Sequence, residues 1–169
     1  MIQGQRTIVA WLAVVLMALP VLAYGENAED WMRKGRDETD PVRQIDYFSK
    51  AIRLNPELAE AYTGRGMAYS DLEDYNKAVA DYTKAIELNP DIAQNYNNRG
   101  WAYGKLGNYD RAVADYTRAI RIDPHYAGAF NNRGVAYYSL GRMEEALADF
   151  DKACKLGYGK GCENYYKIK

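Results

Sequence analysis

The chain has 169 residues, enough for one ordinary domain, and its 48% hydrophobic and 27% charged residues are typical of a folded protein. The formal net charge of −1 gives no electrostatic reason to expect nucleic-acid binding, because phosphate contacts require clustered positive charge. Only one histidine, His125, and two cysteines, Cys154 and Cys162, are present, which leaves few residues for catalysis or metal binding. Sixteen tyrosines stand against three phenylalanines and three tryptophans, and an apolar ring with a polar tip suits half-buried positions between packed helices.

Residues 1–25 have the order of a secretory signal. A basic start that contains Arg6 is followed by an uncharged apolar run from Ile8 to Leu22, and small residues at Ala23 and Gly25 offer cleavage sites. The alternative is an uncleaved membrane anchor, because the run approaches but does not clearly reach the ~20 residues that span a bilayer. We therefore expect an extracytoplasmic protein, in the bacterial periplasm or, alternatively, secreted or anchored to the inner membrane.

Residues 26–58 are interpreted as a degenerate amino-terminal repeat that acts as a cap. The segment from Asp46 to Ile52, ending at Pro56, has the pattern of a second repeat helix, and Trp31 and Gly35 could be the aromatic residue and glycine of a first helix. Three residues are missing between these halves, and the polar segment 37–41 is expected to interrupt the helix.

A repeat of thirty-four residues then organises the chain into copies at 59–92, 93–126 and 127–158. The same residue types recur at this offset: Arg65, Arg99 and Arg133; Gly66, Gly100 and Gly134; Tyr69, Tyr103 and Tyr137; Ala78, Ala112 and Ala146. Within the second copy, apolar spacing predicts amphipathic helices from about 93 to 106 and from about 109 to 122. Gly107 and Asn108 are predicted to form the turn, since both tolerate a left-handed backbone.

The order aromatic, glycine, tyrosine on the first helix and alanine, aromatic, alanine, proline on the second closely resembles the tetratricopeptide repeat. The resemblance covers about 59–156, with Arg99-Gly100 where the family often has leucine-glycine. It implies an all-α fold: a right-handed superhelical stack of antiparallel helix pairs, with a concave groove lined by the first helix of each pair. Stacks of this kind need about three repeats and atypical ends.

The third copy departs from the pattern after Ala153, and residues 159–169 are predicted to form a carboxyl-terminal capping helix beyond a glycine-rich turn. Cys154 and Cys162 resemble the cysteines of secreted Sel1-like repeat proteins, in which the pair joins adjacent helices. An oxidising compartment favours a disulfide, and the alternative is two buried free thiols. A metal site is not expected, because two thiolates without a nearby histidine leave half of a tetrahedral shell empty.

No catalytic constellation is found, so we expect neither an enzyme nor a cofactor. His125 lies in an inter-repeat loop, and the serines after the signal region lie within repeat helices or at their ends, so no serine nucleophile has a base beside it. Each Arg-Gly pair falls inside a helix, which excludes a glycine-rich phosphate loop.

The remaining candidate site is the concave groove, where counting along the first helices places six residues that could bind a partner: Asn97, Asn98, Trp101, Asn131, Asn132 and Tyr138. The paired asparagines resemble the asparagine ladders with which some tetratricopeptide proteins hold an extended peptide, since an amide can donate and accept together. The alternative is that they are solvated polar residues. The carboxylate clamp of chaperone-binding relatives is not expected, because Thr63, Met67 and Gly128 stand at its positions.

Two functions follow from this interpretation. The first is an adaptor that binds a protein or an extended peptide in the groove. The second is a structural role, in which the stack self-associates or forms a fixed subunit of an envelope or secretion assembly. Neither involves nucleic acid, and contact with a membrane is expected only through an uncleaved amino-terminal segment.

Overall fold

The computed structural model describes residues 26–169. The predicted signal or anchor at residues 1–25, with its cleavage sites, lies outside the described residues. Over the described range the chain is helical without any strand, which confirms the all-α class. Its helices are α2 (Ala28–Asp37), α3 (Pro41–Leu54), α4 (Ala59–Asp71), α5 (Tyr75–Leu88), α6 (Ala93–Lys105), α7 (Tyr109–Ile122), α8 (Ala127–Ser139), α9 (Met143–Lys155) and α10 (Gly159–Ile168).

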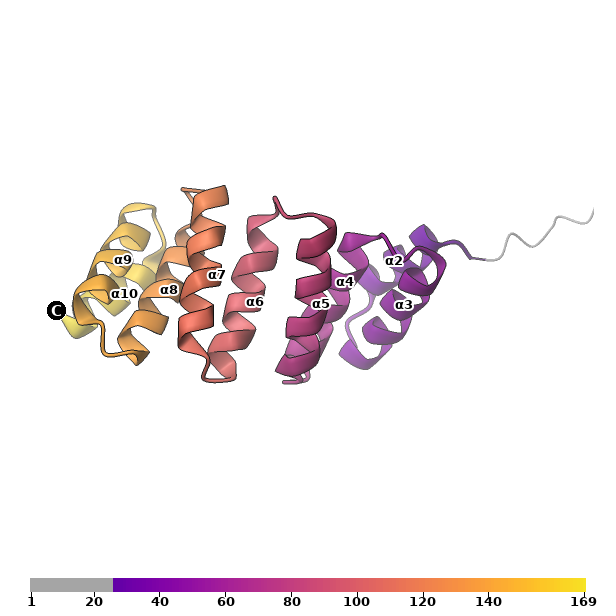
Figure 1. The fold of residues 1–169 in the computed structure, drawn as a ribbon, viewed down its shortest axis with the longest axis horizontal. Helices are drawn as coiled ribbons and strands as arrows, with labels where there is room; N and C mark the ends of the chain where they lie inside the picture. Colours follow the sequence, from indigo (N-terminus) through magenta and orange to yellow (C-terminus); the bar gives the residue numbers. More distant parts are fainter. Residues whose placement is uncertain (1–25) are drawn as a thin grey trace, which may run out of the picture.

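The helices form a row of antiparallel hairpins. Figure 1 shows them in chain order along the long axis, from α2 and α3 at one end to α9 and α10 at the other. Each helix packs mainly against its neighbours in the chain, and the first helices of successive hairpins also contact one another, α2 with α4, α4 with α6, and α6 with α8. The first helices therefore share one side of the row. None of the helices from residue 26 onward combines the length and apolar character that crossing a membrane requires.

The turn inside each full-repeat hairpin has a left-handed residue at one position. Gly107 and Gly141 take φ values of +76° and +74°, and Glu73 takes +59° at the equivalent place in the first full repeat. In a residue other than glycine, such as Glu73, the Cβ atom lies too close to the following carbonyl oxygen in this conformation, so the backbone is strained. Of the two residues predicted to form the turn of the second copy, Gly107 takes the left-handed backbone, whereas Asn108 has a φ of −85° and is the N-cap residue of α7.

A glycine under an aromatic ring holds the two helices of each hairpin together. A Cβ added at Gly100 would lie 2.9 Å from the ring of Tyr116, and one at Gly66 would lie 2.9 Å from that of Tyr82. The third full repeat places Phe150 over its glycine in the same way. The ring of Tyr116 thus fits because Gly100 has no side chain at this point of contact.

The amino-terminal hairpin follows the same rule although it is three residues shorter. A Cβ at Gly35 would come within 2.6 Å of the ring of Phe48, which is 4% exposed. The polar segment after Asp37 forms the turn, where Asp40 caps α3 by accepting from the backbone N–H of Val42, and Pro41 is the first residue of the helix. Residues 28–54 therefore pack as a hairpin of the same design as the later ones.

A buried ladder of arginines, missed in the sequence, joins successive hairpins. The guanidinium of Arg99 on α6 donates through Nε and Nη2 to both carboxylate oxygens of Asp115 on α7, each at 2.8 Å. Its Nη1 also donates to Oγ1 of Thr83 on α5, at 3.1 Å, which reaches the preceding repeat. The side chain of Asp115 raises the pKa of Arg99, so the cation is held in place.

The other two full repeats carry the same contacts. Arg65 binds Asp81 and Ser49, and Arg133 binds Asp149 and Thr117, with donor–acceptor distances between 2.7 and 3.0 Å. Each arginine therefore connects three helices from two hairpins. This paired geometry explains why arginine can stand where the family often has leucine.

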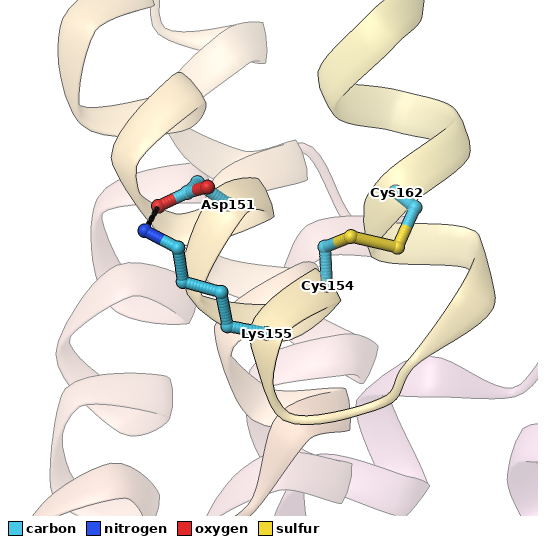
Figure 2. The surroundings of a disulfide bond; sticks show 4 residues. All are labelled: Asp151, Cys154, Lys155 and Cys162. Atoms are coloured by element: carbon cyan, nitrogen blue, oxygen red, sulfur yellow. Dashed lines mark hydrogen bonds and ion pairs between the residues drawn. A yellow bond between two sulfur atoms is a disulfide. The ribbon is translucent and has the colours of Figure 1, made fainter.

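The carboxyl-terminal helix α10 is fixed to α9 by a disulfide between Cys154 and Cys162 (Figure 2). The bond confirms the predicted pairing, and the free-thiol alternative is wrong. The two helices also approach closely, because a Cβ at Gly161 would lie 2.6 Å from that of Ala153. Figure 2 shows a separate ion pair on α9, in which Lys155 Nζ lies 2.6 Å from Asp151.

Candidate partner-binding groove

Three exposed apolar side chains mark the inner side of the stack at one equivalent position per repeat. Met67 on α4, Trp101 on α6 and Val135 on α8 are separated by the repeat length, and 46%, 37% and 44% of their surfaces are exposed. Large apolar residues left open at a regular interval are typical of an interaction surface.

Hollows lie between these side chains. The amino-terminal hollow, of about 370 Å³, and the middle hollow, of about 300 Å³, share Met67 as a wall. Trp101 separates the middle hollow from the carboxyl-terminal hollow of about 430 Å³, and Val135 separates the latter from an end hollow of about 200 Å³. Together they form a groove that runs over the first helices and ends against α10.

The predicted site residues are distributed over three of the hollows. Asn97 and Asn98 line the middle hollow, and Trp101 lines both that hollow and the next. Asn131 and Asn132 line the carboxyl-terminal hollow. Tyr138, which is 49% exposed, lies further along in the end hollow. The candidate residues therefore lie along one groove, but they do not converge on a single pocket.

The asparagines form a hydrogen-bonded network among themselves. Nδ2 of Asn132 on α8 donates to Oδ1 of Asn97 on α6 at 3.1 Å, and Asn97 in turn donates to Oδ1 of Asn98 at 3.5 Å. Nδ2 of Asn98 donates to no other side chain in the part of the chain that the structure describes. Among the four asparagines, Asn98 is therefore the one whose amide nitrogen has no side-chain partner within residues 26–169.

Asn131 has a different environment from the other three. It is only 3% exposed, and its Oδ1 accepts from Nδ2 of Asn164 on α10 at 2.8 Å. Its own Nδ2 donates to Asn132 at 3.4 Å. Asn131 therefore attaches α10 to α8, and Asn164 was not recognised in the sequence because it lies outside the repeat pattern.

Trp101 is held in place by its neighbours. Tyr75 at the start of α5 packs edge-on against its ring, with centroids 5.6 Å apart, and the Lys105 ammonium lies 5.1 Å from the ring centroid. An aromatic side chain that is already ordered loses little entropy on binding, which suits it to anchor a partner.

Charge is unevenly distributed along the groove. Asp71 lines the middle hollow, and the amino-terminal hollow contains Arg36 and Glu60, which lie 3.6 Å apart. The carboxyl-terminal hollow is lined by Lys105 and Lys160 and by no carboxylate. The charge of the groove thus changes from negative in the middle hollow to positive in the hollow next to α10.

The residues considered for chemistry lie apart from the groove. His125 is exposed in the loop between α7 and α8, and its backbone N–H donates to Asp123. Within residues 26–169, acidic, histidine and cysteine side chains form no group of three that could hold a metal. What the inner side of the stack offers is contact surface: apolar walls, amides and lysines.

A row of stacked helical hairpins with an open groove defines a repeat-type scaffold, and the comparisons identify its family. The tetratricopeptide repeat model matches residues 59–92, and a second model of the same description matches residues 97–157. A search of the curated proteins gave no match.

Solved structures agree with these matches. A crystal structure of MamA is 30% identical with a TM-score of 0.75, and the match covers 88% of this chain and 85% of that one. The tetratricopeptide domain of Arabidopsis OM64 is 34% identical, with a TM-score of 0.64 over 67% of this chain and 95% of that one. The second such domain of human RPAP3, solved with the HSP70 peptide SGPTIEEVD, is 33% identical, with a TM-score of 0.62 over 65% and 93%. The chain belongs to the tetratricopeptide repeat family.

Proposed function

We propose that this protein is a non-enzymatic adaptor that binds an extended segment of a partner protein in the concave groove, outside the cytoplasm. The observation that carries the proposal is the series Met67, Trp101 and Val135, exposed at one position per repeat with hollows between them. An extended segment presents side chains at regular intervals, so it can place successive side chains in successive hollows.

The family supports this reading of the groove. The RPAP3 domain was solved in complex with a peptide, so a domain of this family can hold a peptide. The positions of the chaperone-type carboxylate clamp carry Thr63, Met67 and Gly128 here, so we do not transfer that peptide to this protein. Within the groove, the free amide of Asn98 and the ring of Trp101 are proposed as the main contacts.

Two features support a location outside the cytoplasm. Residues 1–25 have the order of an export signal, and structural disulfides such as Cys154–Cys162 persist in oxidising compartments. The periplasm is the simplest such compartment for this chain, with secretion or an inner-membrane anchor as alternatives.

The proposal is tested by capturing partners from the envelope of the native host with the parent protein and with Trp101→Ala. Loss of a central aromatic contact typically costs ~2 kcal/mol or more, which corresponds to about a thirtyfold weaker affinity. Asn98→Ala should weaken binding about fivefold or more, because it removes a hydrogen-bond donor from the groove. Leu54→Ala is the matched control, since this apolar side chain is 56% exposed at the end of α3 and lines none of the hollows. A partner captured equally by all variants would place binding outside the groove.

Self-association is the second candidate. It is favoured by the exposed end of the stack, where Tyr166 on α10 is 74% exposed and its ring packs against that of Tyr165, with centroids 5.3 Å apart. Light scattering over a range of concentrations distinguishes the two candidates. A mass that rises with concentration and returns to that of one chain in Tyr166→Ser would favour assembly.

A further inference from the structure

The carboxyl-terminal hollow has the composition of an anion site. Lys105 on α6 and Lys160 on α10 line it together with the amides of Asn131, Asn132 and Asn164. Neither lysine forms an ion pair with any residue from 26 to 169, whereas Arg36 in the amino-terminal hollow is paired with Glu60. Two cations that share one hollow repel each other, and a bound anion removes that repulsion.

The apolar part of the same hollow limits what the anion can be. Trp101, Val135 and the buried ring of Tyr116 line it beside the lysines, and its volume of about 430 Å³ accommodates more than one side chain. Free inorganic anions gain nothing from these walls. A peptide segment that carries a carboxylate next to an apolar side chain uses both parts.

We propose that this hollow binds the carboxylate of an acidic residue in the partner segment, with the neighbouring apolar side chain against Trp101. The inference rests on the proposed function. It adds the chemistry of the partner segment and the direction in which that segment runs along the groove. Because Asp71 lines the middle hollow and repels an anion there, the acidic end of the segment points toward α10.

The capping helix is therefore part of the binding surface. It supplies Lys160 and Asn164 to the hollow, and the Cys154–Cys162 bond and the Asn164–Asn131 hydrogen bond hold it in position. A stack without this helix would keep Trp101 and Lys105 but would lose Lys160, one of the two lysines that line the hollow.

The test exposes the immobilised, oxidised protein to two random peptide libraries, one with free and one with amidated carboxyl ends, and bound peptides are sequenced by mass spectrometry. We expect enrichment of aspartate and glutamate. Enrichment of these residues in both libraries assigns the site to an acidic side chain. Binding confined to peptides with free carboxyl ends, without enrichment of aspartate or glutamate, would assign the hollow to the terminal carboxylate and overturn the proposed acidic residue.

Charge-reversal variants provide the control. Lys105→Glu combined with Lys160→Glu should weaken binding of the acidic peptides about tenfold to a hundredfold, since charge-assisted hydrogen bonds are lost. Arg121→Glu combined with Lys152→Glu changes the net charge equally on exposed residues that line no hollow, so it should leave binding unchanged. Bound peptides that depend on Trp101 but show no acidic enrichment would overturn the anion site and leave the adaptor function standing. If no bound peptide depends on Trp101, both proposals fail.

Discussion

Removing one partner from the arginine ladder should destabilise the fold strongly, whereas removing both should cost much less. The side chains of Arg99 and Asp115 are 17% and 10% exposed, and two hydrogen bonds of 2.8 Å join them. In Asp115→Ala the guanidinium would keep only Thr83 as a partner, so a largely buried cation would lose its counter-charge. Breaking buried pairs in this way typically costs ~3–5 kcal/mol. We expect about 3 kcal/mol here, because the partial exposure lets water reach the charge.

The double variant Arg99→Leu/Asp115→Ala separates this effect from simple loss of packing. Leucine is the residue that the family often has at this position, and an apolar replacement of a whole buried pair is often close to neutral. Urea unfolding followed by circular dichroism should therefore show a coupling of about 2 kcal/mol or more between the two sites. Thr83→Val is the milder control and should cost about 1–2 kcal/mol, because it removes a hydroxyl that accepts from Arg99 and donates to the carbonyl of Val79. If the double variant is as unstable as the sum of the single changes, the ladder does not act as a paired unit.

Three further predictions concern the turn, the core and the cap. Glu73→Gly should stabilise the first full repeat by ~0.5–1 kcal/mol, because the left-handed backbone there (φ +59°) is strained for glutamate; a lower urea midpoint would contradict this. Burial raises the pKa of Tyr82 to about 12, so the native state holds its proton more tightly than the unfolded chain, and stability should fall by ~2–3 kcal/mol as pH rises from 10 to 12. Phenylalanine stands at the equivalent position of the third full repeat, as Phe150. In Tyr82→Phe, urea unfolding at a series of pH values should show that the loss of stability due to Tyr82 is absent. Replacing Cys154 and Cys162 by serine should cost ~2–3 kcal/mol, and hydrogen exchange should locate the loss in α10; unchanged protection of that helix would contradict the assigned role of the bond.

The fold was predictable because one signal repeats. The offset between Gly66, Gly100 and Gly134 is a packing requirement, since each must leave room for a ring on the next helix. A requirement that recurs at a fixed interval is visible in a single sequence, and the hairpins follow from it. The shortened first hairpin keeps the glycine and the ring but has three residues fewer between them than the full repeats, and for that reason its pattern was weaker.

The ladder was present in the sequence but could not be recognised as such. Asp81, Asp115 and Asp149 recur at the repeat length, as the arginines do, yet the partners lie sixteen residues apart on antiparallel helices. Periodicity places a residue on a face of its own helix, but it does not say which side chain of the next helix it meets. The asparagines show the same limit, because Asn98 and Asn131 belong to one pattern, yet among the described residues the amide nitrogen of Asn98 has no side-chain partner, whereas Asn131 is bound to Asn132 and Asn164.

The contribution of α10 to the groove lies beyond the reach of periodicity for a different reason. Lys160 and Asn164 follow the last full repeat, where the turn is altered and no second copy exists for comparison. Their position depends on how closely α10 approaches α9, which Gly161 permits and the disulfide maintains. The repeated helices already differ in charge, because Asp71 on α4 and Lys105 on α6 stand one repeat length apart and line different hollows. The irregular helix increases this difference, because it adds a second lysine, Lys160, to the hollow that Trp101 and Lys105 line, at a position for which the repeats have no counterpart.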